Sequence, residues 1–272
     1  MADPVITTSF RADTDNLYDW ATVLITKSNG VEVERVTTYD AGSKATSGLV
    51  ITQTTTDGFV SKIVSADAGN NNTWSTIESN FVPGSKSLAS KVTTYDNGTT
   101  NTETYIGGAL SQTVRTGSSG QPFTSITTTY DLVNGGHTVA TAQANGQTTT
   151  DVFNEAGKLV SRTQTDGASD SADWSSVETT YTTTEGVATV ERTYTYDNGV
   201  TRAETLVGGK LTTVVQTDSE TASWSTITEA FGADGKLTSR AKVEDDNDTI
   251  VETYAAGVLT EVTRNDVSGA TA

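Results

Sequence analysis

Residues Trp224 to Arg264 show most clearly how this chain folds, and they read WSTITEAF (224–231), KLTSRAKV (236–243), TIVETY (249–254) and VLTEVTR (258–264). Turn-forming Gly, Asp and Asn residues separate these four runs. Thr, Val, Ile and Tyr favour strands, whereas Gly, Asn and Asp favour tight turns. The stretch therefore predicts four short antiparallel strands joined by hairpins.

The same unit recurs along the chain at a period of about fifty residues, which is typical of solenoids, propellers and linear arrays. Each copy opens on an aromatic residue followed by a small polar one, at Trp20, Trp74, Phe123, Trp174 and Trp224. We expect one continuous repeat domain, made of a partial repeat at 1–19, repeats at 20–73, 74–122, 123–173, 174–223 and 224–266, and a flexible tail at 267–272.

The ends of the chain distinguish an open array from a closed ring. Residues 5–13 resemble the fourth strand of a repeat such as 211–218, and the last repeat keeps its own fourth strand at 258–264. A ring closed by the N-terminal strand needs only one of these two. The sequence predicts an all-β fold, an open array or solenoid of five four-stranded antiparallel repeats, and the alternative is a five-bladed β-propeller.

Side-chain alternation gives an expectation about the two faces of the sheet. With a strict period of two, Trp224 lies on one face and Ile227 and Phe231 lie on the other. Glu252 shares the face of Ile250 and Tyr254. Both faces are therefore expected to carry large apolar side chains, unlike a sandwich with one apolar and one polar face.

The chain is strongly acidic, with a net charge of −17, and contains no Cys. A surface of this sign repels phosphate backbones and anionic headgroups, so we expect neither nucleic acid binding nor membrane insertion. Disulfide frameworks and Cys-ligated zinc are excluded. Met1-Ala2-Asp3-Pro4 is not the start of a secretory signal peptide.

No catalytic residue is expected. His137 is the single histidine, which excludes a zinc site with two imidazoles. Four acids, Glu103, Asp151, Glu204 and Glu252, recur at one place in the third strand of successive repeats. A catalytic pair belongs to one site, whereas these acids come once per repeat. We expect them to pair with Arg or Lys across the strands, and we expect the chain not to be an enzyme.

The loops before the repeat-opening aromatic residues are acidic, and calcium favours several carboxylates from one flexible loop. Calcium is therefore the one candidate cofactor, against the alternative of solvated turns. The recurring Trp and Tyr rings suit either stacking on sugars or packing between repeats. The candidate metal ligands are Asp13, Asp15, Asp19, Asp166, Asp170 and Asp173.

Two kinds of segment carry a family resemblance. These are Tyr-Asp-Asn-Gly at 95–98 and 196–199, and FGADGKLTSR at 231–240 with its counterpart FNEAGKLVSR at 153–162. They resemble the YD repeats of RHS-type bacterial surface proteins. The whole unit also looks like repeat segments of long acidic proteins exported by type I, RTX-associated systems, although the calcium-binding nonapeptide G-G-x-G-x-D is absent. The resemblance implies an extracellular or cell-surface location in bacteria.

Two functions follow as hypotheses. The first is a non-catalytic structural or adhesive segment, whose partners are neighbouring repeats of a longer parent chain. The second is a module that binds calcium, extracellular polysaccharide, or both, through the acidic loops and exposed aromatic residues.

Overall fold

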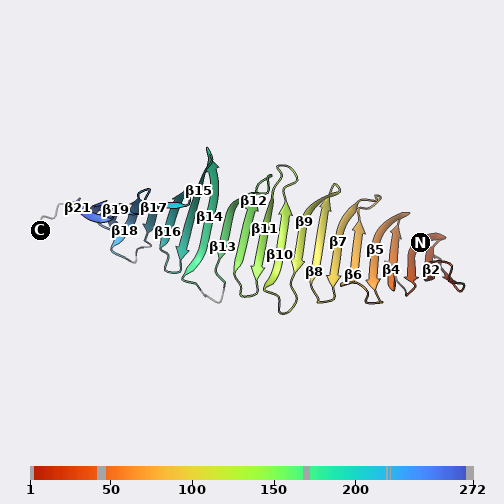
Figure 1. Cartoon of the computed structure of the whole chain (residues 1–272). Helices are drawn as coiled ribbons and strands as arrows, with labels where there is room; N and C mark the ends of the chain where they lie inside the picture. The colour runs from red at the N-terminus through yellow and green to blue at the C-terminus, as the bar shows by residue number, and fades with distance from the viewer. Residues whose placement is uncertain (1–2, 42–46, 168–171, 219, 221, 268–272) are drawn as a thin grey trace. The chain divides into compact units, whose positions relative to one another are not determined.

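The computed structural model describes residues 3–41, 47–167, 172–218, 220 and 222–267. The chain divides into two compact units, Met1–Gly135 and Gly136–Ala272. The division falls between β10 and β11, inside the third predicted repeat. Every element labelled in Figure 1 is a strand.

The described residues of unit 1 form ten strands joined in sequence order. A Trp or Phe opens the first strand of each repeat, at β2, β6 and β10, as the period predicts. The strands are β1 (Ile6–Ala12), β2 (Trp20–Ser28), β3 (Val31–Tyr39), β4 (Leu49–Thr56), β5 (Phe59–Asp67), β6 (Trp74–Phe81), β7 (Leu88–Tyr95), β8 (Thr100–Ile106), β9 (Ala109–Thr116) and β10 (Phe123–Tyr130).

Eleven strands are formed by the residues of unit 2 that the structure describes, and β14 and β18 begin at Trp174 and Trp224. The strands are β11 (His137–Gln143), β12 (Thr148–Phe153), β13 (Leu159–Thr165), β14 (Trp174–Thr184), β15 (Val187–Tyr196), β16 (Thr201–Val207), β17 (Lys210–Thr217), β18 (Trp224–Phe231), β19 (Leu237–Glu244), β20 (Thr249–Ala255) and β21 (Val258–Asn265).

Within each unit every strand pairs antiparallel with the next strand in sequence, so the prediction of an open all-β array is confirmed. The pairing continues across repeat boundaries: Ala66 on β5 lies opposite Thr76 on β6, and Gln216 on β17 lies opposite Ile227 on β18. A propeller blade is a separate sheet. The alternative of a five-bladed propeller is therefore wrong, because the fourth strand of one repeat and the first strand of the next belong to one ladder.

Two kinds of turn join the strands. Asn29-Gly30, Gly107-Gly108 and Gly208-Gly209 have positive φ at both residues, as the primed hairpin turns require. In the loop after Tyr95 only Gly98 has a positive φ, and its N–H donates to the Tyr95 carbonyl over 2.9 Å. The first kind matches the twist of the flanking strands directly, and the second reverses the chain over a longer loop.

Each unit is a single layer. Among the described residues, the strands contact only their neighbours in sequence, and no second sheet or helix lies over either face. A single layer has no interior of the ordinary kind, so apolar side chains are shielded by neighbours on their own face. Stability must come from contacts between adjacent strands, as in other repeat proteins.

A β-bulge at the start of the first strand changes the facing of the aromatic residue. In β18, Trp224 lies opposite Glu244 while Thr226 lies opposite Val243, so Ser225 is an extra residue. Because Glu244 and Val243 are on opposite faces, Trp224 and Ile227 come to the same face. The expectation that they lie on opposite faces is wrong, since strict alternation fails at the bulge.

The serine of the repeated Trp-Ser motif is this bulge residue. The hydroxyls of Ser75, Ser175 and Ser225 each donate to a carbonyl on the paired strand, over 3.2, 3.1 and 3.4 Å. The same register shift follows Trp20, Trp74 and Trp174. The Ser of the motif is thus the extra residue of the bulge and hydrogen-bonds a backbone carbonyl there. The Trp of the motif is placed on the same face as the apolar residue three positions later.

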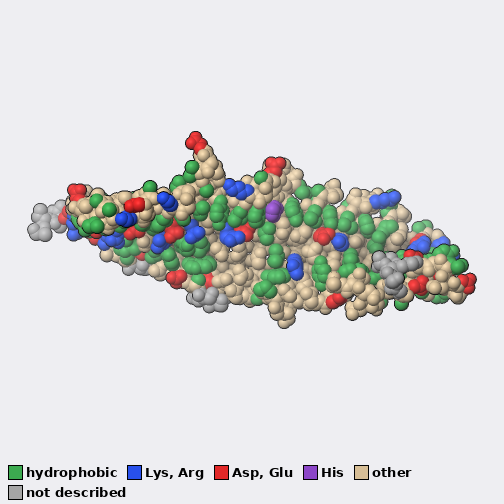
Figure 2. Space-filling view, in the orientation of Figure 1, with side chains coloured by type: hydrophobic (Ala, Val, Ile, Leu, Met, Phe, Trp, Pro, Cys, Tyr) green, Lys and Arg blue, Asp and Glu red, His purple; other side chains and the backbone are tan. Residues whose placement is uncertain are grey.

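We call the side of each unit that carries these aromatic residues the tryptophan face. The five buried hydrophobic residues of the described chain are on it by register: Val23 and Leu49 in unit 1, and Val177, Val214 and Ile227 in unit 2. Figure 2 shows hydrophobic side chains interleaved with Lys, Arg, Asp and Glu. The apolar residues are covered by these long side chains rather than by a second layer.

The opposite side of unit 2, the threonine face, explains the abundance of Thr. Seven adjacent strands place a Thr or Ser in one cross-strand row, and two of these hydroxyls, on Thr148 and Thr165, are 2.6 Å apart. β-branched side chains favour the strand conformation without needing burial. The row consists of Thr148, Thr165, Ser176, Thr195, Thr201, Thr217 and Thr226.

Candidate functional site

The recurring acids of the third strands lie opposite basic residues of the preceding or following strand. Glu103 lies opposite Lys91 with 3.8 Å between the Glu Oε2 and the Lys Nζ. Asp151 lies opposite Arg162, with 2.6 Å between the Asp Oδ1 and the Arg Nε. The expectation that these acids are cross-paired is confirmed.

The two later repeats follow the same rule. Glu204 lies opposite Arg192 and also binds Arg202, whose Nη2 is 3.0 Å from Glu204 Oε1. Glu252 lies opposite Arg240, at 3.8 Å. These pairs form a repeated ion-pair ladder on the tryptophan face, in which each of the four acids lies within 4 Å of at least one cation.

Tyrosines extend this ladder. Tyr105 and Tyr254 donate hydrogen bonds to Glu103 and Glu252, over 2.6 and 2.7 Å. A carboxylate acceptor stabilises the phenol over the phenolate. The bond raises the pKa of Tyr105 to about 12, and the pKa of Tyr254 is also raised. The acids therefore organise neighbouring side chains on the surface of the sheet.

The first aspartate of the loops before the repeat-opening Trp residues closes the loop. The carboxylates of Asp13 and Asp218 accept the N–H groups of Tyr18 and Ala222, over 2.7 and 2.6 Å. Asp166 accepts the N–H of Ala172 over 2.9 Å. These residues shape the loop through ordinary backbone hydrogen bonds.

The predicted calcium ligands are only partly described. In the described residues, the carboxylates of Asp13, Asp15 and Asp19 do not come together as a group of three. Asp166 and Asp173 are described, and Asp170 lies outside the described residues. Calcium binding by these loops stays a prediction.

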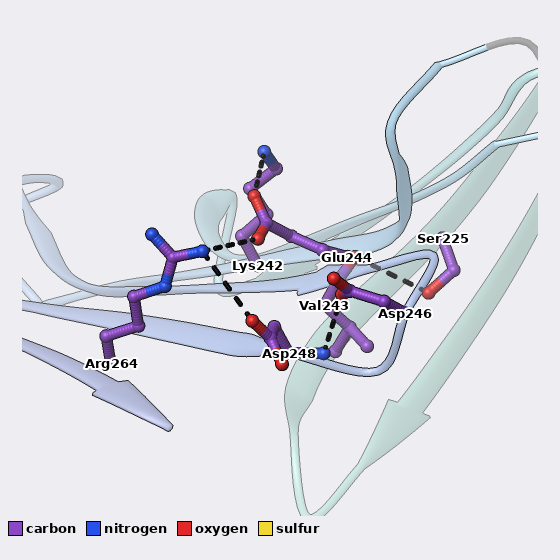
Figure 3. Close-up of polar contacts among 7 residues, drawn as sticks. All are labelled: Ser225, Lys242, Val243, Glu244, Asp246, Asp248 and Arg264. Carbon is purple, nitrogen blue, oxygen red and sulfur yellow. Dashed lines mark hydrogen bonds and ion pairs between the residues drawn. The ribbon is translucent and has the colours of Figure 1, made fainter. Parts of the chain in front are cut away.

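A different acidic group comes together at the turn between β19 and β20. The carboxylates of Glu244, Asp246 and Asp248 lie within 4.8 Å of one another (Figure 3). The N–H of Asp248 donates to Asp246 Oδ1 over 3.1 Å, and the N–H of Glu244 donates to the Asp248 carbonyl over 2.8 Å. The tight turn is therefore what brings the three carboxylates together.

Basic residues already compensate this acidic group. Lys242 Nζ is 3.0 Å from Glu244 Oε1, and Arg264 Nη2 is 3.4 Å from Glu244 Oε2 and 3.6 Å from Asp248 Oδ2. Asp248 is 3% exposed and also accepts the N–H of Val267 over 2.9 Å. A divalent cation would have to displace the Arg264 guanidinium. As described, the group joins the end of β21 to the preceding hairpin.

The sequence predicts only a turn at residues 244–248. The signal that could have found the group is the spacing of acids at 244, 246 and 248, which a tight turn folds onto one side. What sequence could not supply is the approach of Arg264 from the next strand. That contact depends on the register of β20 with β21, which places Ile250 opposite Arg264.

In each unit a shallow hollow adjoins aromatic residues. One, of about 410 Å³, lies beside Trp224 and is lined also by Asp218, Glu220, Ser225 and Asp245. The other, of about 350 Å³, lies in unit 1 among Phe59, Val60, Ile63 and Phe81. The first combines an indole ring with carboxylates, and the second is mainly apolar.

The aromatic residues of the tryptophan face make contacts of their own. Tyr18 stacks on Trp20 with 5.1 Å between ring centroids, and the Arg11 guanidinium lies 6.0 Å from the Trp20 ring. The four Trp side chains are partly exposed. They serve as packing residues on the sheet surface while leaving some ring area open to solvent.

No family model matches this sequence, and no curated protein is significantly similar to it. The likeness to YD repeats therefore rests on the short motifs quoted above. The described residues contain no helix with the length and hydrophobicity needed to cross a bilayer. The class that the fold defines is an open, single-layer antiparallel β-repeat protein.

Proposed function

We propose that this chain is a non-catalytic structural or adhesive repeat segment of a secreted or cell-surface bacterial protein. The observation that carries the proposal is that, in the part of the chain that the structure describes, each strand contacts only its neighbours in sequence. An array of this kind can be lengthened or shortened by whole repeats without rebuilding a shared core. That property suits a spacer whose reach is set by repeat number.

The distribution of charged groups supports the same proposal. The recurring acids are held in cross-strand ion pairs, one or more in each repeat, rather than in one specialised cleft. Charges spread over an exposed sheet also oppose stacking of sheets on one another. Most domains bury their apolar residues in a compact core, and a single-layer array has no such core. A charged surface instead keeps the array from aggregating.

Deletion of one whole repeat tests the proposal. Removing 174–223 joins the loop before Trp174 to Trp224, so that β18 replaces β14 as the partner of β13. We expect the shortened chain to fold, with a cooperative melt, and to lose about 19 Å of array because four strands are removed at about 4.8 Å each. Small-angle scattering measures the change in size.

A deletion out of register is the control. Removing 174–186 deletes β14 and its turn, so that β15 follows β13 directly and the ladder loses the strand that matches both of them, including the Trp174 bulge and Val177. We expect this variant to lose its cooperative melt. If the whole-repeat deletion unfolds in the same way, the repeats are not independent modules and the spacer proposal fails.

The proposed location has its own test. Antibody raised against the chain should label intact producing bacteria or be captured from their culture medium. Labelling that requires permeabilised cells would contradict a secreted or surface location without bearing on the spacer role.

The second candidate function, binding of calcium, carbohydrate, or both, is favoured by the hollow beside Trp224 and by the acidic group at 244–248. An indole ring suits a sugar face, and carboxylates suit sugar hydroxyls or calcium. Titration of Trp fluorescence with oligosaccharides tests the first ligand, with Trp224→Phe as the matched variant.

Melting curves with calcium and with a chelator test the second ligand. If calcium binds the 244–248 group, it raises the melting temperature of the wild type and of Asp13→Asn, but not of Asp246→Asn. If calcium binds the loop before Trp20, it raises the melting temperature of Asp246→Asn but not of Asp13→Asn. No shift in the wild type would end the calcium hypothesis for both places.

A further inference from the structure

In the described residues β21 pairs only with β20, along one of its two edges, and all eight of its residues are exposed. Three are apolar, with Val258 68%, Leu259 48% and Val262 55% exposed. An exposed edge of this kind offers unpaired backbone N–H and C=O groups to another strand.

The equivalent strand one repeat earlier shows what an additional strand does to this edge. Val214 on β17 lies opposite Glu204, and Val262 on β21 lies opposite Glu252, so the two valines hold the same place in the repeat. Val214 is 1% exposed, because β18 pairs along the other edge of β17. A strand added to β21 would bury Val262 in the same way.

The edge is also held in place. Arg264 binds Glu244 and Asp248, and the N–H of Val267 donates to Asp248, so both groups fasten the end of β21 to the hairpin beside it. The guanidinium of Arg264 is ion-paired with Glu244 and Asp248. A strand that is already ordered loses less conformational entropy when another strand pairs with it.

We propose that β21 pairs with β21 of a second copy of this chain, antiparallel and about a two-fold axis. A two-fold axis perpendicular to the sheet reverses the strand direction and keeps the tryptophan faces on one side, so the ladder continues across the junction. The interface is isologous, the arrangement found in most symmetric dimers. This inference does not depend on the proposed spacer role.

The side chains of β21 are compatible with self-pairing. In the register centred on Val262, the two Val262 side chains face each other, Glu261 lies opposite Thr263, and Arg264 lies opposite Thr260. No like charges are directly opposed, which matters in a chain of net charge −17. Pairing of one strand buries little area, so the dimer is weak and forms at high protein concentration.

Sedimentation velocity over a wide concentration range tests the dimer. We expect a monomer–dimer equilibrium that shifts toward dimer as salt screens the repulsion between the acidic copies. Val262→Lys places two ammonium groups face to face and should abolish the dimer. The matched control is Val187→Lys, at a hydrophobic residue 47% exposed away from this edge, which should dimerise like the wild type.

Crosslinking identifies the register. The chain has no Cys, so Val262→Cys introduces a single thiol at the two-fold axis. Directly opposed residues of an antiparallel pair have Cα atoms about 4.5–5.5 Å apart, a distance a disulfide can span. With oxidised glutathione as oxidant, Val262→Cys should form dimers much faster than Val187→Cys.

Three results would overturn the proposal. The first is a monomer at every concentration, which would leave the edge for a neighbouring repeat of a longer chain. The second is a dimer that persists in Val262→Lys with the wild-type melting curve. The third is a dimer lost in Phe10→Lys but kept in Val262→Lys, which would place the contact at β1.

Discussion

β17 and β21 are the same strand in successive repeats, yet one is interior and the other is an edge. They share Leu, Thr and Val at equivalent positions, and each pairs with the preceding strand through a bulge of the same kind. Val214 is nearly inaccessible, whereas Val262 is more than half exposed. The comparison teaches that a fourth strand is buried by the strand that follows it, and that a single hairpin buries little by itself.

Trp174 opens the strand that follows β13, and its substitution should have the largest effect. Trp174→Ala removes a large side chain that lies opposite Tyr196 and on the face of the buried Val177. We expect unfolding free energy to fall by about 3 kcal/mol, as for large-to-small changes at packed sites. Urea denaturation measures it, and a wild-type midpoint would mean that the ring is free for ligand binding.

The two equivalent valines test the comparison directly. Val214→Ala should reduce the free energy of unfolding by about 2 kcal/mol, because two methyl groups are lost from a covered position. Val262→Ala, its matched control, should cost less than about 0.5 kcal/mol, as exposed substitutions do. Measured below the dimerisation range, equal effects would contradict the claim that β18 provides the burial.

The bulges of β17 and β21 provide a test with a smaller expected loss of stability, because the extra residue in each is a Thr whose hydroxyl is hydrogen-bonded. Thr212 and Thr260 each donate to the carbonyl of the residue opposite the bulge, Thr205 and Thr253, over 2.9 Å. Thr212→Ala should cost about 1 kcal/mol, since its acceptor is part-buried. Thr260→Ala should cost less, because water can replace an exposed hydroxyl. Thermal melts of the two variants, with Thr→Ser versions as controls, give the difference.

Arg264 tests how the edge is held. Its side chain is 62% exposed, so Arg264→Ala should change global stability by less than about 1 kcal/mol. Local opening should respond more, since β21 loses its link to Glu244 and Asp248. Hydrogen exchange of the β21 amides should become faster while that of β17 stays unchanged. Protection of both strands as in the wild type would show that the ion pairs do not fasten the edge.

Alkaline titration compares two tyrosines on third strands, Tyr105 on β8 in the second repeat and Tyr254 on β20 in the last repeat. The pKa of Tyr105 is raised to about 12 by its hydrogen bond to Glu103, and that of Tyr254 is raised by Glu252. A raised folded-state pKa means that the stabilisation is complete below the ordinary tyrosine range and is lost as pH rises through the folded value. For Tyr105 the loss should occur near pH 12.

Absorbance of tyrosinate follows this titration. Tyr105→Phe should remove the component that ionises at the highest pH, and Glu103→Gln should move that component toward lower pH. A titration curve unchanged by either substitution would mean that the hydrogen bond is not formed in solution.

Much of the fold could be predicted because the repeat imposes local rules. The aromatic period located the first strand of each repeat, and Gly pairs such as Gly107-Gly108 located primed turns. The recurrence of Glu103 and its counterparts predicted cross-strand ion pairs, since a charge kept at one register needs a partner beside it. The group at Glu244, Asp246 and Asp248 could be seen only once the turn was folded.

The strands, their turns and their antiparallel order follow from the amino-acid sequence alone, because they depend on backbone preferences within a few residues. The tertiary structure decided which face each aromatic side chain occupies, since an extra residue such as Ser225 reverses the alternation only when the strand is paired. It also decided that Val214 is buried and Val262 exposed. In a single layer a side chain is buried only where a further strand pairs beside its own. The type of residue alone therefore does not predict whether it is buried.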